Sequence, residues 1–228
     1  MQNILTSKLE DFFSRYKKEG YKKGDLIIRA FEEPSGVFYL KDGFVKMNFI
    51  YEDGSEITLN IFKPHSFFPM IWAIAGTENA YFFQAMTSVS VYKAPKDDVL
   101  KFLRENPDVL FDLARRIIVG FDGLLLNIRH ILFGSAIERV TSAIFLSARR
   151  FGEKQADGKT IIKLKLTHQD IANIAGITRE TASISIKKLE KQKLITYKKR
   201  FICVNNLETF EKDRYEFSAK DISPISNA

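Results

Sequence analysis

The sequence predicts an α+β protein with three parts: a small β-barrel or jelly roll, a long helix, and a C-terminal helix-turn-helix followed by a β-hairpin. Three observations predict this order. Short strand-like runs alternate with turn residues as far as residue 93, apolar residues recur every three or four positions from 110 to 131, and two capped segments joined by a glycine occupy 167–191. Regularly spaced short strands are typical of small barrels, and a glycine-turned pair of capped helices is typical of a helix-turn-helix.

The N-terminal part begins with an amphipathic helix, which is expected over residues 3–19. Strand-like runs, separated by turn residues, follow at 37–40, 44–51, 56–62, 81–85 and 89–93. In one of these runs Ile57, Leu59 and Ile61 fall on one face, while polar residues fall on the other. This period of two predicts a half-buried strand, and the regular spacing of the runs predicts the barrel or jelly roll.

A long helix is expected next. Asn106 suits the N-cap and Pro107 suits the first helical position, and the apolar pattern continues to about Phe133. The expected seam consists of Leu110, Ala114, Ile117, Phe121, Leu124, Ile128 and Ile131. A sustained period of 3.5 residues is typical of a coiled coil, so the seam predicts a homodimer. The alternative is a helix packed on its own β domain, and the apolar stripe is wide enough to serve both.

Two capping signals and a glycine place the helices that follow. Ser135 and Glu138 match a capping box, and Thr167 and Asp170 match its looser, Asp-ended form. Gly176 supplies the positive φ that a tight turn between helices needs. The expected elements are a hinge at 133–135, a helix to 151, a loop at 152–158, a strand at 160–166, helices over 168–175 and 179–191, and a β-hairpin wing at 196–204.

The charge is concentrated in one block. The whole chain of 228 residues has a formal net charge of +7. Residues 136–206 hold 15 Lys and Arg against 6 Asp and Glu, a net charge of +9, whereas residues 1–135 are neutral with 17 of each and hold 15 of the 20 Phe. A basic block beside a neutral one indicates a module for nucleic acid or an anionic membrane. The alternative is that the charge serves solubility alone.

A helix-turn-helix inside the basic block favours DNA. An α-helix fits the major groove, and the residues of its first turns reach base edges. Arg179 can donate two hydrogen bonds to a guanine, and Glu180 can accept one from a cytosine amino group. The candidate base-reading residues are Arg179, Glu180, Ser183 and Ile184. The candidate phosphate contacts are Thr167, Thr178, Lys187, Lys188, Lys198, Lys199 and Arg200.

The sequence lacks the usual signals of disulfide-bonded, secreted and membrane proteins and of enzymes. The single cysteine, Cys203, allows no intrachain disulfide, which favours a reducing cytoplasm. The sequence shows no secretory signal and no run of eighteen apolar residues, so neither export nor a membrane span is expected. No nucleophile–base pair, metal cluster or phosphate-binding glycine loop is visible, so an enzyme is not expected. A sensor that acts through protein contacts, with vestigial DNA binding, remains the second hypothesis.

The segment from Leu166 to Ile195, LTHQDIANIAGITRETASISIKKLEKQKLI, resembles the Crp/Fnr family of bacterial transcription regulators, including Thr-Arg-Glu-Thr at the start of the second helix. The resemblance covers nearly the whole chain. It implies a cyclic-nucleotide-binding-like β-roll over 1–106, a dimerisation helix and hinge over 107–134, a winged helix-turn-helix over 135–206 and a tail over 207–228. It also implies a homodimer on two-fold symmetric double-stranded DNA, and RNA polymerase as a candidate partner of the loop 152–158.

The sequence departs from the family at the positions that bind cyclic AMP and at one position that reads DNA bases. Members that bind cyclic AMP hold its ribose with a Gly-Glu pair and its phosphate with an Arg-Ser pair. An ungapped count back from Asn106 places Phe68 and Pro69 at the first pair and Asn79 and Ala80 at the second, and no Arg lies between residues 30 and 103. Cyclic nucleotide is therefore not expected as the effector. Members that read a TGTGA-like half-site carry a second arginine where this chain has Ile184, which predicts T/A at that position.

No cofactor is expected. The iron–sulfur branch of the family needs an N-terminal cysteine cluster, and Cys203 is alone. His65 is a candidate haem ligand, although a lone histidine is more often structural, and His168 is expected to be an ordinary surface residue. The candidate effector pocket is lined by Phe68, Pro69, Trp72, Asn79, Phe82 and Leu124. It is either a filled core or a site for an apolar small molecule.

Overall fold

The computed structural model describes residues 2–207, so the expected tail beyond Leu207 lies outside the described part. The described residues divide into two compact units, and the boundary lies between Leu125 and Leu126. The first unit comprises α1 (Gln2–Phe13), β1 (Lys17–Tyr21), β2 (Leu26–Ile28), β3 (Val37–Asp42), β4 (Val45–Ile50), β5 (Glu56–Phe62), β6 (Phe67–Phe68), the π-helix η1 (Ile71–Ala75), β7 (Phe82–Ala85), β8 (Val89–Ala94), α2 (Lys96–Glu105) and the greater part of α3 (Pro107–Phe133).

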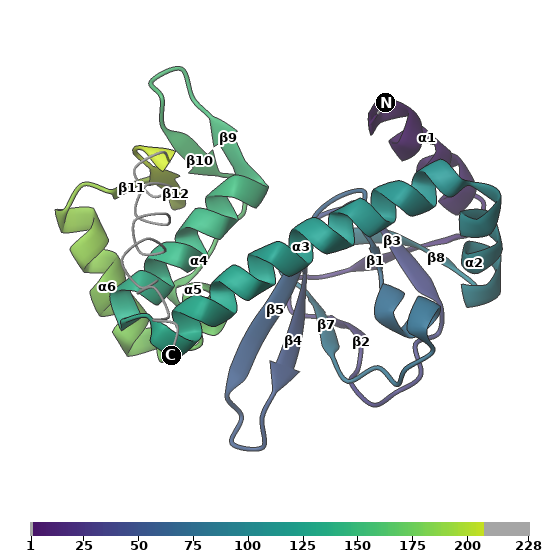
Figure 1. The fold of residues 1–228 in the computed structure, drawn as a ribbon, viewed down its shortest axis with the longest axis horizontal. Helices are drawn as coiled ribbons and strands as arrows, with labels where there is room; N and C mark the ends of the chain where they lie inside the picture. Colours follow the sequence, from purple (N-terminus) through teal and green to yellow (C-terminus); the bar gives the residue numbers. More distant parts are fainter. Residues whose placement is uncertain (1, 208–228) are drawn as a thin grey trace, which may run out of the picture. The chain divides into compact units, whose positions relative to one another are not determined.

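The strands of this unit form two antiparallel four-stranded sheets, in the orders β1-β8-β3-β6 and β2-β7-β4-β5 (Figure 1). An apolar core fills the space between the sheets. The Phe68 ring is its centre: it is fully buried, stacks on Phe83 with centroids 5.1 Å apart, and also contacts Phe62 and Phe38. The predicted α+β class with an N-terminal jelly roll is therefore confirmed.

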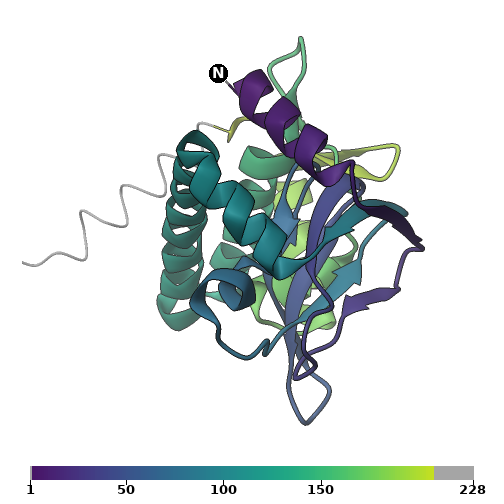
Figure 2. The ribbon, with the colours of Figure 1, turned by 90° about the vertical axis from the view of Figure 1, so that its right-hand side faces the viewer.

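A second core lies on the other face of the first sheet, where helices cover it. Alternate residues of β3 point in opposite directions, so Val37 and Tyr39 contact this helical layer while Phe38 and Leu40 join the core between the sheets. Phe13 of α1 stacks on Tyr39, with centroids 5.0 Å apart. Both ribbon views place α1 beside α2 and the start of α3 (Figures 1 and 2).

The helix expected over 3–19 ends at Phe13, because the chain turns and then pairs with β8 from Lys17 onward. The sequence analysis also missed α2. The Asn106 side chain does not cap α3 but donates to the Phe102 carbonyl at the end of α2, 2.8 Å away. Its backbone carbonyl accepts from Val109 and Leu110, so Asn106 both ends α2 and begins α3.

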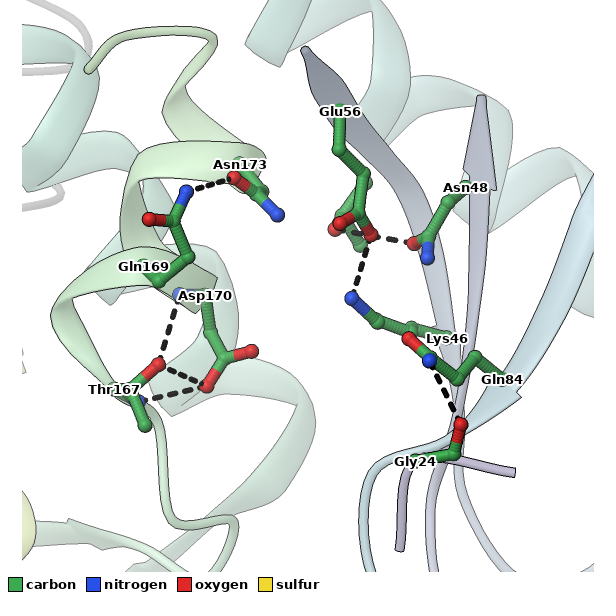
Figure 3. Close-up of polar contacts among 10 residues, drawn as sticks. Gly24, Lys46, Asn48, Glu56, Gln84, Thr167, Gln169, Asp170 and Asn173 are labelled. Atoms are coloured by element: carbon green, nitrogen blue, oxygen red, sulfur yellow. Dashed lines mark hydrogen bonds and ion pairs between the residues drawn. The ribbon is translucent and has the colours of Figure 1, made fainter. Parts of the chain in front are cut away.

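The period of two expected in β5 is broken by a β-bulge. Asn48 pairs with Thr58 and Met47 with Asn60, which leaves Leu59 as the extra residue on β5. Thr58 is therefore buried instead of exposed, and its hydroxyl donates to the Asn48 side-chain carbonyl at 3.3 Å. Figure 3 shows Asn48 beside the ion pair between Lys46 and Glu56.

Helix α3 runs over the predicted span and buries little of its apolar surface. Val109 and Leu113 pack in the helical core of the first unit. The expected seam residues Leu110, Ile117, Phe121 and Ile128 are between 40% and 57% exposed. Monomers seldom leave a continuous apolar face of this kind in water, and such a face indicates a partner.

As far as Leu207, the second unit is built from the end of α3, the helices α4 (Ala136–Phe151), α5 (His168–Ala175) and α6 (Arg179–Lys191), and a small sheet. The strands of this sheet are β9 (Gly152–Lys154), β10 (Thr160–Ile162), β11 (Ile195–Lys198) and β12 (Phe201–Val204). The sheet order is β11-β12-β10-β9, so part of the expected loop at 152–158 is a strand that pairs with β10, and the expected strand at 160–166 ends at Ile162. Within the described residues, no helix is long and apolar enough to cross a membrane.

Candidate DNA interface

The start of α5 is fixed by the predicted capping box. The Thr167 backbone N–H donates to Asp170 Oδ2 at 2.8 Å, and the Asp170 backbone N–H donates to Thr167 Oγ1 at 3.1 Å. The Thr167 hydroxyl also donates to the same carboxylate (Figure 3). Two backbone donors that a helix start leaves without partners are thereby satisfied.

Replacing Thr167 with alanine is expected to destabilise the protein by about 1 kcal/mol, because the N-cap acceptor is lost. Urea denaturation of the full chain measures this change. Thr167→Ser keeps the hydroxyl and is expected to stay within about 0.5 kcal/mol of the wild type. An alanine variant as stable as the serine variant would show that the capping box does not hold this helix.

Gly176 sets the turn between α5 and α6. It has φ +63°, a left-handed conformation that favours glycine, and its N–H donates to the Ala172 carbonyl. The Ile177 N–H donates to the same carbonyl at 3.1 Å. Ala182, Ile186 and Leu189 then bury one face of α6.

The opposite face of α6 is exposed. Thr178 caps the helix by accepting from the Thr181 N–H at 3.3 Å. Arg179 and Glu180 in the first turn are exposed, and Ile184 is 59% exposed. These three predicted base-reading residues are therefore accessible to a ligand. Arg179 offers hydrogen-bond donors, Glu180 offers an acceptor and Ile184 offers an apolar group, and these are the groups that read base edges.

Ser183 differs from the other candidate base-reading residues. It is half-buried, and its hydroxyl donates to the Arg179 carbonyl at 2.8 Å. The same oxygen lies 2.8 Å from Nδ1 of His168 at the start of α5. The sequence analysis missed this role for His168, because no pattern relates two residues whose contact depends on how the helices cross.

The cations around α6 are available to an anionic partner. Lys187, Lys188, Lys198, Lys199 and Arg200 are all exposed. Among the described residues, none of these five forms an ion pair. Phosphate groups of DNA attract such unpaired cations and release their own counterions on binding.

The wing tip is a two-residue turn that presents its charges outward. Lys199 and Arg200 have φ of 49° and 69°, and Lys198 pairs with Phe201 across the hairpin. Positive φ at both turn residues is the type I′ geometry that suits a tight hairpin. Tyr197 lies in β11, two residues before this turn. Partial burial raises the pKa of Tyr197 and Glu190 adds to the shift, so the phenol is neutral at physiological pH.

Comparison with known proteins agrees with this geometry. The family model described as a cyclic nucleotide-binding domain matches residues 18–106, and the model described as a Crp-like helix-turn-helix domain matches residues 138–212. A "Global nitrogen regulator" from a Nostoc species is 30% identical, over 85% of this chain and 87% of that protein. The chain belongs to the Crp/Fnr family of transcription regulators. It is thus a DNA-binding protein of the helix-turn-helix class.

Solved structures of other Crp/Fnr regulators share the fold. A CooA mutant from Carboxydothermus hydrogenoformans aligns with a TM-score of 0.73 at 21% identity, over 89% of each chain. FixK2 from Bradyrhizobium japonicum aligns with a TM-score of 0.70 at 20% identity, over 86% of this chain and 96% of its own.

The β-roll of this Crp/Fnr regulator does not gather the candidate pocket residues at one place. Phe68 belongs to the core between the sheets, whereas Trp72 belongs to the core under the helices. The Asn79 side chain donates to the Arg29 and Tyr81 carbonyls, at 3.0 and 2.9 Å. Pro69 is buried, and Phe82 and Leu124 are half-buried. This packing favours the filled core over a pocket.

The two residues considered as metal or haem ligands, His65 and Cys203, are held within the protein by contacts with neighbouring groups or by burial. His65 Nδ1 lies 2.8 Å from the Tyr39 hydroxyl and 3.5 Å from a Glu10 carboxylate oxygen, and Arg116 donates to its carbonyl. Cys203 is buried in β12. Over residues 2–207, no three His, Cys, Asp or Glu side chains gather closely enough to hold a metal ion.

Proposed function

We propose that the chain acts as a homodimeric, sequence-specific regulator that binds a two-fold symmetric DNA site through α6, with the wing on the flanking backbone. The observation that carries the proposal is the exposed first turns of α6, where Arg179, Glu180 and Ile184 lie beside unpaired cations. Arg179 and Glu180 read base edges, and Ile184 contacts a thymine methyl. Thr167, Thr178 and the basic residues of α6 and the wing contact phosphates.

The homodimer is supported by the apolar face of α3. A second copy of the same helix would cover the exposed Leu110, Ile117, Phe121 and Ile128 in the 3.5-residue register that coiled coils use. Two copies would also supply the two α6 helices that a symmetric site requires, about 34 Å apart on the DNA. The protein then works in the cytoplasm, where the DNA of a bacterium lies.

DNA binding is expected to fall about 100,000-fold between about 50 and 200 mM salt, because the five basic residues among the candidate phosphate contacts of each protomer neutralise phosphates and release counterions, and the homodimer carries two such sets. Electrophoretic mobility shift with DNA selected from a random pool measures this dependence. A chain that enriches no sequence at low salt would contradict the proposal. It would favour a sensor that acts through protein contacts.

Cyclic nucleotide is not the effector in this proposal. Asn79 stands at one of the positions where cyclic AMP-binding members carry the phosphate-binding pair, and its side chain is occupied by two backbone carbonyls. Phe68 stands at a ribose position and is fully buried in the stacked aromatic core. No arginine between residues 30 and 103 is present to pair with a phosphate.

Cyclic AMP and cyclic GMP are therefore expected to leave the melting temperature unchanged. A ligand at 100 times its Kd would add about 2.7 kcal/mol to the stability of the folded state, which a thermal melt detects easily. The selected DNA serves as the positive control in the same experiment. A rise in melting temperature with either nucleotide would show that the roll opens to accept it.

A further inference from the structure

A chain of two hydrogen bonds joins the first turn of α5 to the first turn of α6. Ser183 has one hydroxyl hydrogen, and it is donated to the Arg179 carbonyl, which can only accept. The contact of 2.8 Å between Ser183 Oγ and His168 Nδ1 must then use a hydrogen on the imidazole. His168 therefore donates from Nδ1 to Ser183, and Ser183 donates to Arg179.

These two hydrogen bonds link the starts of the two helices that carry the candidate DNA contacts. His168 is the first residue of α5, and Arg179 is the first residue of α6. Most of the other buried residues of the two helices are apolar, such as Ile171, Ala172 and Ala182. Apolar contacts are non-directional and tolerate small rotations of a helix about its axis, whereas a hydrogen bond at 2.8 Å does not.

We propose that His168 is a positioning residue for the recognition helix α6. Its donation to Ser183 fixes the rotation of α6, so that Arg179, Glu180 and Ile184 present their side chains to the bases in one register. Ser183 is the partner of His168 and is not itself a base-reading residue, since its hydrogen and one of its lone pairs are both engaged. This inference rests on the proposed function, because the register matters only if α6 reads bases.

The proposal separates sequence-specific binding from binding in general. Loss of the His168 donor leaves every cation near α6 in place, so affinity for DNA of unrelated sequence is expected to stay within about 2-fold. Affinity for the preferred site is expected to fall about 5- to 150-fold, which corresponds to the loss of one hydrogen bond in each of the two protomers. The preference should weaken at all the base pairs that Arg179, Glu180 and Ile184 read, and not at one pair alone.

The experiment uses the full chain and begins with selection of the preferred site by the wild type. A wild type that selects no site sinks the proposed function, and only a wild type that selects one tests His168. His168→Ala, Ser183→Ala and the double variant are then compared on the selected site and on unrelated DNA, with melting temperatures recorded. His168→Asn serves as the conservative variant, since its amide N–H can donate at the position of Nδ1.

The expected result is that both single variants and the double variant lose the same factor on the selected site, and that His168→Asn restores most of it. Three results would overturn the proposal. His168→Ala could bind the selected site as well as the wild type. It could lose affinity for both DNAs equally, together with melting temperature, which would mean a structural role only. Ser183→Ala could change the preference at a single base pair, which would mean that Ser183 reads a base directly.

Discussion

An aspartate in place of Ile117 is expected to convert the proposed homodimer into monomers. Ile117 lies in the middle of the expected seam and is 52% exposed on the single chain. In a coiled coil the exposed half of its side chain would be buried against the partner, which contributes about 0.8–1.6 kcal/mol per protomer. A carboxylate there removes that contribution and would place two negative charges against each other in a dry interface. Multi-angle light scattering gives the mass directly.

The monomer is also expected to lose the symmetric DNA site. A dimer binds two half-sites at once, whereas a monomer binds one, and its affinity falls towards that of non-specific binding, by about 1,000-fold or more. Val119→Asp is the matched control. Val119 is 62% exposed on the same helix and lies two residues, about 200°, around it from Ile117. It introduces the same charge on the opposite face and should leave both mass and affinity unchanged.

The two variants together decide between the alternatives for α3. If Ile117→Asp remains dimeric and binds DNA normally, then the exposed face serves something other than a second copy of the chain. If both variants become monomeric, the dimer interface is wider than the 3.5-residue seam. Only loss with Ile117→Asp and retention with Val119→Asp supports the seam as predicted from the sequence.

Features that depend on neighbouring residues in the chain were predictable. The capping box Ser135-Glu138 and the cap at Thr167 are local hydrogen bonds, so they placed the starts of α4 and α5 correctly. Gly176 adopts the positive φ expected of it. The wing hairpin was also predicted, because its alternating residues and tight basic turn are close together in the sequence.

Features that depend on distant pairing were not predictable. The β-bulge that buries Thr58 arises from the register between β4 and β5, and a period of two within one strand does not contain it. Phe68 and Trp72 are four positions apart, but the chain between them passes from one side of a sheet to the other. In the candidate DNA interface, the contact between His168 and Ser183 depends on the crossing of two helices, which the apolar patterns leave open.

Replacing Arg179 with alanine is expected to abolish recognition of one base pair in each half-site. A bidentate arginine–guanine contact is worth about 1–3 kcal/mol, or about 5- to 150-fold in affinity. The two half-sites of a dimer are well separated, so the losses should add, and affinity for the whole site falls by about 2–6 kcal/mol. Arg179 is exposed and, within the part of the chain that the structure describes, forms no ion pair, so little change in stability accompanies the loss. Repeated selection with the variant should show a relaxed base at one position of each half-site.

Lys187→Ala distinguishes loss of base reading from loss of charge. Lys187 is an exposed cation on the same helix, and we expect it to contact a phosphate. Its loss should weaken binding to every sequence about equally and reduce the salt slope by about 1 for each contact removed, with no change in the selected bases. Arg179→Ala should show the opposite pattern, with a changed base preference and a larger loss on the selected site than on unrelated DNA. If the two variants behave alike, then Arg179 acts as another phosphate contact, and the specificity of α6 must come from Glu180, Ile184 or the shape of the DNA.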